Sequence, residues 1–409
     1  MADELTIWLY GINTATITEV RNRLRLIYTG DALIEHALGT PVLSVALPLT
    51  DVHFAQGPTR AFLDGLLPEG ESRRVIAEDF NLRATDTYGL IRALGRDCAG
   101  AIIVQPSGEP PPPDASTTTA DPLNNDALAD LVKNLRSAPL GVSDRVRISL
   151  AGVQQKLLLT RMPDGRWGRP VDGTPSTHIL KPEIRDYPNT VQNETFCMRL
   201  ARSLGLETAE VETTEIAGRR LIVVRRYDRM IGEDGSVQRI HQEDFCQATS
   251  MLPKQKYQED GGPSLLKLSQ VLRSVAVPRS VEALLSATIA NVLVGNGDAH
   301  AKNFSLLHHR DGKITLAPLY DVMSSLYYND DRLALYIDDV RRTNRVSGDR
   351  LANEAMSWGI PRVRAVEIIK DLLVRAPSAI EASREETIGT PKEIVRLVEQ
   401  QIDLLGSSI

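Results

Sequence analysis

A run of four consecutive prolines divides this chain more clearly than any other feature of its 409 residues. The run lies inside the stretch PSGEPPPPDASTTTADP, residues 106–122. Proline has no backbone N–H and a fixed φ, so such a run fits neither a helix nor a central strand. The Ser/Thr-rich residues that follow have little to bury. We therefore expect a linker or loop over residues 106–140 that closes an N-terminal subdomain, residues 1–105.

The hydrophobic pattern predicts different structures before and after this linker. Residues 1–105 contain strand-like runs such as LTIWLYG and RLRLIYTG, then a helical segment near RAFLDGLLPEG, and predict a β-rich subdomain. Residues 141–241 contain several short strand patterns and one helical pattern, which is typical of a small α+β lobe. Residues 242–409 are mostly helical in pattern, with the best helix over 279–294 and Ser280 as its expected N-cap.

Composition excludes some classes of protein. The formal net charge is -6, so we expect a poor stand-alone DNA binder, and any DNA contact would come mainly through a basic partner. No run of about 18 apolar residues predicts a membrane helix, and the first residues do not resemble a signal peptide. The three cysteines are far apart in sequence, which fits a reducing cytoplasm better than a disulfide framework or a zinc cluster.

One stretch carries the pattern of a chemical site: NVLVGNGDAHAKNFSLLHHRDGKITLAPLYD. An apolar helix leads into a Gly-Asn-Gly loop with Asp298 and Asn303, a hairpin turns at Asp311-Gly312, and Asp321 follows. Phosphoryl transfer needs a carboxylate near the attacking hydroxyl and oxygen ligands for Mg²⁺. Protein kinases use the same Asp-to-Asn spacing, followed by a hairpin and a metal-binding Asp. Each piece alone is weak, and the ordered combination is what points to phosphoryl transfer.

A second stretch could bind the phosphates of a nucleotide. In RISLAGVQQK, Gly152 permits a close approach of the backbone, and turn amides can hold phosphate oxygens. Lys156 and Lys181 are candidate phosphate cations, and Lys181 ends a predicted strand, where kinases place a lysine. Neither GxGxxG nor GxxxxGK[ST] is present, so the usual kinase glycine loop and the P-loop are both excluded.

These stretches resemble the HipA family of serine/threonine protein kinases, toxins of bacterial toxin–antitoxin pairs. The resemblance covers nearly the whole chain, and the GDAHAKN block followed by LYD is its most specific part. It implies a protein-kinase-like two-lobed α+β fold, with 141–241 as the ATP-binding region and 242–409 as the helical lobe. The matching segments are FLDGLLPEG at 62–70, ISLAGVQQK at 148–156, THILKP at 177–182, NETFCMRLA at 193–201, VVRRYDR at 223–229, HQEDFCQA at 241–248, GNGDAHAKNFSLL at 295–307 and APLYDVMS at 317–324.

The resemblance also implies a role for individual residues. Asp298 corresponds to the catalytic base, Asn303 and Asp321 to the Mg²⁺ ligands, and Ser149 to the residue that the family autophosphorylates. The residues that would bind ATP are the phosphate loop, the strand lysine, the hinge with Asp228 facing the ribose, and a histidine of the catalytic loop: Leu150, Ala151, Gly152, Val153, Gln154, Gln155, Lys156, Lys181, Arg225, Tyr227, Asp228 and His300.

The family's biology gives further expectations. The substrate would be an aminoacyl-tRNA synthetase, with the glutamyl enzyme as the first candidate, and its modification would stop translation and arrest growth. The segment 184–192 would be a mobile loop that helps to select this substrate. The partner would be a HipB-like helix-turn-helix antitoxin that binds operator DNA, and autophosphorylation at Ser149 would switch the kinase off.

Two other interpretations remain open from the sequence. The chain could be a catalytically inactive co-repressor that acts only with a DNA-binding antitoxin, although Asp298, Asn303, Asp321 and Lys181 are all present. It could also be a metal-dependent hydrolase that uses Asp298 with three histidines. Adjacent histidines on a strand face opposite sides, which counts against this site. The histidines are His300, His308 and His309.

Overall fold

The chain passes three times between two groups of elements. A computed structural model describes residues 4–112, 115–117, 120–143 and 145–409. Unit 1 consists of Met1–Pro182 and Thr214–Pro253, and unit 2 of Glu183–Thr213 and Lys254–Ile409. Four residues of the predicted linker (113, 114, 118 and 119), and Asp144 near the expected start of the second lobe, lie outside the described residues.

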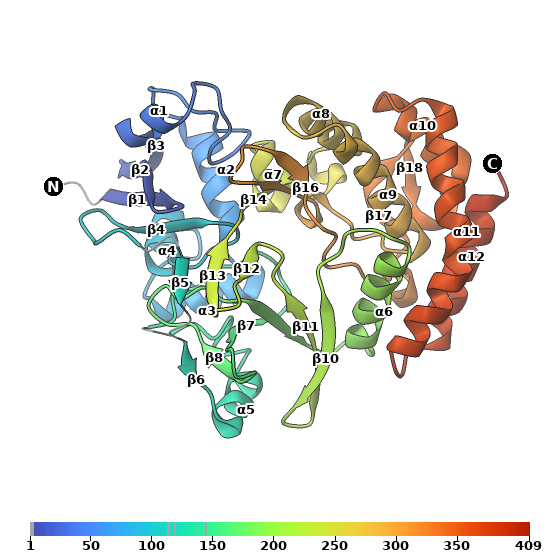
Figure 1. The fold of residues 1–409 in the computed structure, drawn as a ribbon, viewed down its shortest axis with the longest axis horizontal. Coiled ribbons are helices and arrows are strands. Elements are labelled where there is room, and N and C mark those ends of the chain that lie inside the picture. Colours follow the sequence, from blue (N-terminus) through green and yellow to red (C-terminus); the bar gives the residue numbers. More distant parts are fainter. Residues whose placement is uncertain (1–3, 113–114, 118–119, 144) are drawn as a thin grey trace. The chain divides into compact units, whose positions relative to one another are not determined.

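Unit 1 begins with an antiparallel sheet packed against helices. The strand order is β3-β2-β1-β4, and α2 contacts β3 (Figure 1). Buried side chains of the sheet, such as Ile7, Ile17 and Leu26, share one core with Phe62 and Leu63 of α2. The predicted strands and helix of this subdomain are therefore confirmed. Its elements are β1 (Glu4–Leu9), β2 (Ile12–Val20), β3 (Arg23–Tyr28), α1 (Gly30–Glu35), α2 (Gln56–Leu66), α3 (Gly70–Asp79), α4 (Thr87–Leu94) and β4 (Ile102–Pro106).

The rest of unit 1 is built on a second sheet, with the order β10-β11-β9-β7-β8-β6. Leu128 and Val132 of α5 share a core with Leu159, Leu180 and Val223 of this sheet. Its elements are β6 (Asp121–Pro122), α5 (Asn125–Lys133), β7 (Leu157–Arg161), β8 (Trp167–Arg169), β9 (His178–Pro182), β10 (Val211–Ile216) and β11 (Arg219–Arg225), and unit 1 also contains β5 (Ala115–Thr117), β12 (Arg229–Ile231), β13 (Ser236–Arg239), β14 (His241–Asp244) and α7 (Phe245–Ala248).

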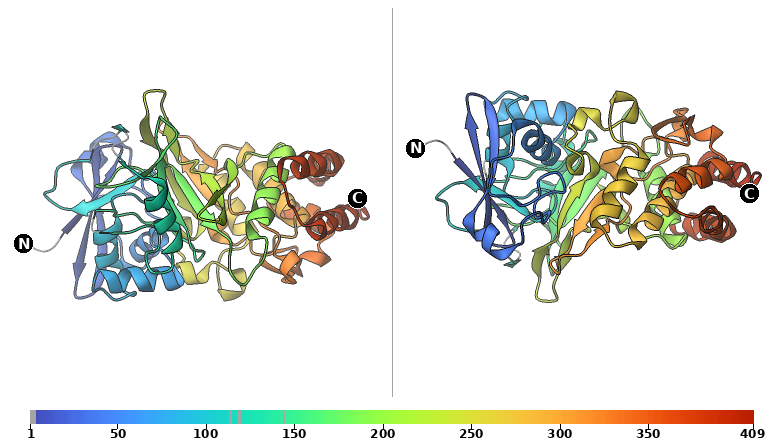
Figure 2. Two further views of the ribbon diagram at one scale, coloured as in Figure 1. Left: turned by 90° about the horizontal axis from the view of Figure 1, so that it is seen from below. Right: turned by 90° about the horizontal axis from the view of Figure 1, so that it is seen from above.

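Unit 2 is mostly helical. The long helix α11 contacts α6, α9, α10 and α12, and Figure 2 shows α11 and α12 side by side. Its elements are α6 (Thr190–Ser203), α8 (Leu265–Val275), α9 (Arg279–Leu293), β15 (Ser305–His308), β16 (Ile314–Leu316), β17 (Arg332–Ile337), β18 (Val340–Arg342), α10 (Gly348–Ser357), α11 (Arg362–Glu386) and α12 (Lys392–Gly406), with short 3-10 helices at Gln258–Asp260, Ala301–Asn303, Leu326–Tyr328 and Thr343–Arg345 and a further one, Pro253–Gln255, at the unit boundary.

The expected helix over 279–294 is present as α9, but its predicted cap is wrong. The N-cap position is occupied by Pro278, and Ser280 lies inside the helix. The hydroxyl of Ser280 is buried and accepts a hydrogen bond from the backbone N–H of Leu316 at 3.3 Å. Ser280 therefore links α9 to the hairpin β15–β16 instead of capping the helix.

The predicted linker, 106–140, lies within unit 1 and contains β5, β6 and α5. A buried ion cluster explains why the residues before and after the linker belong to one unit. Asp97, which precedes the linker, pairs with Arg229 at 3.0 Å and Arg239 at 3.3 Å, and Arg226 lies at 3.6 Å. We call Asp97, Arg226, Asp228, Arg229 and Arg239 the ion cluster. It joins the first subdomain to the residues that follow β11.

No helix in the described part of the chain is both long and apolar enough to cross a membrane.

Candidate active site

The loop after α9 is held in place by its glycines. Gly297 donates its N–H to Ser325 Oγ at 2.9 Å and accepts the N–H of Ala334 at 2.7 Å. A Cβ on Gly297 would lie 2.1 Å from the carbonyl oxygen of Arg332, so only glycine fits there without a backbone shift. The loop is therefore fixed against β17 before any ligand binds.

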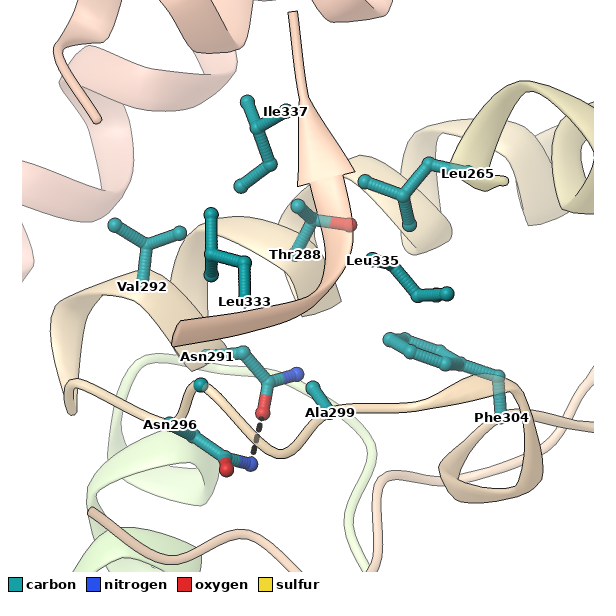
Figure 3. Close-up of a pocket in the computed structure, with 11 residues that line it drawn as sticks. Leu265, Thr288, Asn291, Val292, Asn296, Ala299, Phe304, Leu333, Leu335 and Ile337 are labelled. Atoms are coloured by element: carbon teal, nitrogen blue, oxygen red, sulfur yellow. Dashed lines mark hydrogen bonds between the residues drawn. The ribbon is translucent and has the colours of Figure 1, made fainter. Parts of the chain in front are cut away.

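Two asparagines also hold the same loop in place. Asn296 Nδ2 donates to Asn291 Oδ1 of α9 at 2.7 Å, as the dashed line in Figure 3 shows. Asn296 Oδ1 in turn accepts the backbone N–H of Asp298 at 3.2 Å. Both asparagines are buried, and they border a mainly apolar cavity under the loop. The position of Asp298 thus depends on a chain of hydrogen bonds that begins on α9.

The side chain of Asp298 is exposed, as a base for an incoming hydroxyl must be. Its Oδ1 accepts a hydrogen bond from the hydroxyl of Tyr257 at 2.9 Å. Surrounding protein atoms raise the pKa of Asp298, with smaller contributions from Asp321, while Tyr257 and Lys256 oppose the rise. A raised pKa makes this carboxylate a better proton acceptor. No sequence pattern indicated Tyr257, which lies 41 residues before Asp298.

The structure brings Asn303 and Asp321 together. Asn303 Nδ2 donates to Asp321 Oδ2 at 3.2 Å, and Asn303 Oδ1 accepts the N–H of His300 at 3.2 Å. Asp321 is exposed and has a φ of 59°, in the left-handed region. The amide nitrogen of Asn303, not its oxygen, therefore faces Asp321 in this structure. Carboxylate and amide oxygens are ligands that Mg²⁺ prefers, together with several waters, so the residue types of this pair fit a Mg²⁺ site once the Asn303 amide is turned.

The same loop does not fit a zinc hydrolase. Among the residues that the structure describes, no group of three or more His, Cys, Asp or Glu side chains could hold a metal. His300 is buried, and its ring packs edge-on against Tyr257 at 5.4 Å. Burial, with help from Lys256, lowers the pKa of His300 to about 3. This lowered pKa favours the neutral imidazole, and the expected role of His300 in binding ATP stays a prediction.

Helix α6 anchors the segment that carries Asp321. The buried amide of Asn193 accepts the backbone N–H of Ser324 at 2.9 Å and donates to the carbonyl oxygen of the same residue at 3.0 Å. These two bonds pair with the backbone of Ser324 as a neighbouring strand would. They hold Ser324, three residues after Asp321, in place. Sequence reasoning placed residue 193 in a helix but did not identify this contact, which joins residues 131 positions apart.

The segment 184–192 also contacts residues that follow Asp321. The rings of Tyr187 and Tyr328 meet edge-on at 5.1 Å, and Tyr328 meets Tyr327 at 4.9 Å. The hydroxyl of Tyr328 donates to the carbonyl oxygen of Pro188 at 3.1 Å, and Asn189 Nδ2 donates to the Tyr327 hydroxyl at 3.1 Å. The proposed substrate loop thus has a defined resting position in this structure, and its mobility stays a prediction.

In unit 1 the predicted phosphate loop has a strongly bent backbone. Gly152 has a φ of 110°, which favours glycine, and a Cβ there would lie 2.4 Å from Lys156 Nζ. Lys156 Nζ donates to the carbonyl oxygen of Ala151 at 2.7 Å. Leu157, the residue after Lys156, pairs with Leu180, the residue before Lys181, in antiparallel register. Both lysines are buried.

The remaining predicted positions in unit 1 lie beside this loop and at the end of β11. Ser149 is fully buried; its hydroxyl donates to the carbonyl oxygen of Leu66 at 2.6 Å. Arg225 ends β11, and the hydroxyl of Tyr227 donates to Gln242 Oε1. The loop residues Leu150, Val153, Gln154 and Gln155 are partly or fully exposed.

The environment of Asp228 differs from the expected one. Its carboxylate is buried and accepts hydrogen bonds from Arg226 Nη2 at 2.7 Å, Arg229 Nη1 at 2.8 Å and the N–H of Gly100 at 2.7 Å. Although burial opposes ionisation, the two arginines hold the pKa of Asp228 well below its usual range. The expectation that Asp228 faces a ribose is therefore corrected: its carboxylate belongs to the ion cluster.

Two family models match the chain. Residues 5–105 match the HipA N-terminal domain, and residues 148–380, more than half of the chain, match the HipA-like C-terminal domain. The chain belongs to the HipA family. The resemblance inferred from its motifs is thereby confirmed.

Individual relatives agree with this assignment. The HipA-family chain is 31% identical over 357 residues to the serine/threonine-protein kinase toxin HipA of Shewanella oneidensis, covering 83% of this chain and 80% of the toxin. It is 41% identical over 296 residues to Y4mE of Sinorhizobium fredii, a protein assigned as a kinase, covering 70% of this chain and 69% of Y4mE. The predicted enzyme class, a serine/threonine protein kinase, is confirmed.

A solved structure confirms the fold. The HipA of Shewanella oneidensis, in a complex with HipB and its operator DNA, superposes with a TM-score of 0.82 and 28% identity. The match covers 98% of this chain and 96% of that one. The predicted fold, α+β and similar to protein kinases, is correct for this member of the HipA family.

Proposed function

We propose that this HipA-family kinase is a toxin that transfers the γ-phosphoryl group of ATP to a serine or threonine of an aminoacyl-tRNA synthetase, with the glutamyl enzyme as the first candidate. The observation that supports it most directly is the grouping of Asp298, with Tyr257 on its carboxylate, and the adjacent pair Asn303 and Asp321 in one loop system. Phosphoryl transfer depends mainly on positioning and electrostatics, which such a fixed loop supplies.

Each residue has a distinct role in this proposal. Asn303 and Asp321 would hold Mg²⁺, which neutralises the charge of the nucleotide phosphates when bound. In unit 1, Lys156, Lys181 and the backbone amides of the loop 150–156 would bind ATP phosphates, and backbone groups of Arg225 and Tyr227 would bind the adenine. Asp298 would orient the acceptor hydroxyl and take its proton. Tyr257 would keep the carboxylate of Asp298 in one orientation.

The partners and setting are proposed from the family. A HipB-like helix-turn-helix antitoxin would neutralise the toxin and bring it to operator DNA, as the Shewanella complex of HipA, HipB and DNA suggests. A net charge of -6 fits a protein that reaches DNA through a basic partner. We place this activity in the cytoplasm, where the synthetases work. Ser149 would be the site of inhibitory autophosphorylation.

The test is intact-mass analysis and peptide mapping after incubation with Mg²⁺-ATP, with and without a candidate synthetase. We expect phosphate on Ser149 or on the synthetase with the wild type, and a rate about 10²–10⁴-fold lower with Asp298→Asn, because the proton acceptor is lost. Asp311→Asn, on the exposed turn of the hairpin β15–β16, is the matched control and should behave as wild type.

Two outcomes would change the assignment. If ATP binds but no phosphate appears on any protein, the alternative of an inactive co-repressor that works through its antitoxin is favoured. If ATP does not bind at all in the presence of Mg²⁺, the proposed kinase activity of this chain is wrong.

A further inference from the structure

The segment that follows β11 alternates between buried and partly exposed side chains. Arg225 and Tyr227 are partly exposed, whereas Arg226 and Asp228 are buried. Residues 225–227 form the expected hinge, whose backbone would bind the adenine in the proposed function. The middle residue of the hinge, Arg226, received no role from the family resemblance. Its surroundings show what holds the backbone of the hinge in place.

The guanidinium of Arg226 uses all three of its nitrogens. Nε donates to Asp228 Oδ1 at 3.0 Å, and Nη2 donates to Asp228 Oδ2 at 2.7 Å. Nη2 also donates to the carbonyl oxygen of Cys98 at 2.9 Å, and Nη1 donates to Ser176 Oγ at 2.8 Å. Although burial opposes the charge, Asp228 and Asp97 keep the pKa of Arg226 above its usual range. The side chain is therefore charged and held in one position.

The groups that hold Arg226 are themselves fixed. Asp97 and Cys98 lie between α4 and β4 of the first subdomain, and both are buried. Asp97 Oδ2 accepts the backbone N–H of Ser176 at 2.9 Å and the hydroxyl of the same residue at 2.6 Å. Ser176 is also fully buried, just before β9. Arg226 is thus bonded to a rigid support, part of which belongs to the first subdomain.

The side chain and the backbone of the hinge are linked by covalent geometry. The carbonyl group of Arg225 and the N–H of Tyr227 belong to the two planar peptide groups that meet at the Cα of Arg226. The first of these groups is held because the N–H of Arg226 donates to the carbonyl oxygen of Thr177 at 2.9 Å. The second is held because the carbonyl oxygen of Arg226 accepts the N–H of Arg229 at 3.3 Å. Adenine presents an amino donor and ring-nitrogen acceptors, which one carbonyl and one N–H can match.

We propose that Arg226 is a positioning residue for the nucleotide: its buried side chain anchors the hinge to the first subdomain and so orients the backbone groups that bind adenine. This inference rests on the proposed function, in which the hinge binds ATP. Arg226 itself does not touch the nucleotide, because its side chain lies in the ion cluster. The first subdomain thereby takes part in nucleotide binding, although the site residues predicted from the sequence all follow it.

The ion cluster offers a matched pair of variants. It contains three arginines and two aspartates, so replacing one arginine by methionine leaves two charges of each sign. Arg239 is buried like Arg226, but it ends β13 and bonds to Asp97 Oδ1 at 3.3 Å and to the carbonyl oxygen of Gly173 at 2.9 Å. Arg226→Met and Arg239→Met therefore remove the same charge and the same side-chain volume from one cluster. Only Arg226→Met removes the anchor of the hinge.

The first measurement uses the full chain without nucleotide, so that it does not depend on kinase activity. Hydrogen–deuterium exchange is followed in peptides that cover residues 222–228. Arg226→Met should raise amide exchange in the hinge about 3- to 10-fold above Arg239→Met, the effect of losing one hydrogen bond of ordinary strength. Peptides from α2 and α9 show whether each variant is folded. Equal exchange of the hinge in the two folded variants would overturn the proposal.

Arg226→Lys provides a second variant, which carries the test if Arg226→Met does not fold. Lysine keeps the charge but lacks the planar fork of donors that reaches several partners at once. The exchange of the hinge and the affinity for ATP should therefore lie between those of wild type and Arg226→Met. Wild-type values of both quantities in Arg226→Lys would show that the anchor is unnecessary.

The second measurement compares the binding of ATP with the binding of tripolyphosphate, both with Mg²⁺, by titration calorimetry. Arg226→Met should raise the Kd of ATP about 3- to 10-fold relative to Arg239→Met, because a misplaced hinge loses a hydrogen bond to the adenine. The Kd of tripolyphosphate, which has no base, should be the same in both variants. An equal loss of affinity for both ligands would mean a general disturbance and refute the positioning role. A wild type that binds no ATP would refute the proposed function, and the exchange result would still decide whether Arg226 anchors the hinge.

Discussion

At the scale of single residues, the hydrogen bond from Tyr257 to Asp298 gives a direct way to test what controls the pKa of Asp298. The hydrogen bond from Tyr257 is the strongest influence that lowers the pKa of Asp298. The ionised aspartate is the form that can accept a proton, so activity should fall as the pH drops through the pKa of Asp298. Removing the bond leaves the surrounding protein atoms, which raise the pKa of Asp298, less opposed.

We therefore predict that Tyr257→Phe moves the acid limb of the pH profile of kcat/KM to higher pH. The direction follows because the lost bond favoured the ionised form, by about 1–3 kcal/mol for a bond to a charged group. The measurement is the initial phosphorylation rate across the acid range. Tyr336→Phe, on β17 with its ring against Arg341, is the control, and the same shift in both variants would contradict the prediction.

The sequence predicted the residues of the proposed site but not the side chains that hold them in place. Asp298, Asn303 and Asp321 could be predicted because phosphoryl transfer needs their chemical types in that order. Tyr257 and Asn291 could not be predicted, because a residue that orients another side chain can lie at any distance from it in the sequence. Asp228 was misplaced for a related reason: whether a carboxylate meets arginines or a ligand is decided by tertiary packing.

At the scale of elements, α6 acts as the support for the segment that begins at Asp321. Asn193 uses both its donor and its acceptor on the backbone of Ser324. The position of the proposed Mg²⁺ ligand then depends on a helix that carries no ligand itself. A change at Asn193 should therefore affect metal binding as well as stability.

Asn193→Ala should cost about 1–3 kcal/mol of stability, since backbone polar groups of Ser324 are left buried without partners. It should also raise the Mg²⁺ concentration needed for half-maximal activity. The measurement is a Mg²⁺ titration at saturating ATP beside thermal unfolding. Leu200→Ala, in the buried face of α6, should lower stability without changing the Mg²⁺ requirement. Equal Mg²⁺ curves for wild type and Asn193→Ala would refute the support role.

Elements were predicted well where a periodic pattern was long. The strands β7, β9 and β11 and the helix α9 were recognisable because their apolar residues face continuous cores. Ile148, in a short apolar stretch just before the phosphate loop, makes only an isolated bridge with Asp97. A short apolar run cannot show whether a partner strand is available, so local pattern alone overestimates strands of this length.

At the scale of the whole molecule, the ion cluster explains why the residues before and after the proline-rich stretch belong to one unit. Asp97 lies before the proline-rich stretch, and the three arginines that surround it lie far after it. Proline content identified a place where regular structure stops. It could not show that buried charges on both sides of that place belong to one unit, because such pairing is visible only in three dimensions.

We predict that Asp97→Asn lowers the free energy of unfolding by about 3–5 kcal/mol, because it leaves buried arginines without a compensating charge. The arginines keep the pKa of Asp97 below its usual value despite its burial. Its stabilising contribution is therefore present above the unfolded pKa of about 3.9 and is lost as the pH falls through the lower folded value.

The measurement is denaturant unfolding at neutral pH and at several acid pH values. Wild type should lose stability more steeply with acid than Asp97→Asn, which lacks this titrating group. Asp164→Asn, at an exposed residue in the turn between β7 and β8, is the control and should unfold as wild type does at each pH. If wild type and Asp97→Asn lost stability equally steeply as the pH is lowered, the assigned role of the ion cluster would be contradicted.

The interleaving of the two units also sets an order during synthesis on the ribosome. Every segment of unit 1 has been translated once Pro253 has emerged, whereas unit 2 needs α11 and α12, more than a hundred residues later. A nascent chain can thus complete the proposed phosphate loop while the loop of Asp298 has not yet been translated. Residues 183–213 must wait, as a tethered loop, for the helices that bury α6. Ribosomes stalled between these points would carry a protein that has the proposed phosphate loop but still lacks Asp298, the proposed base.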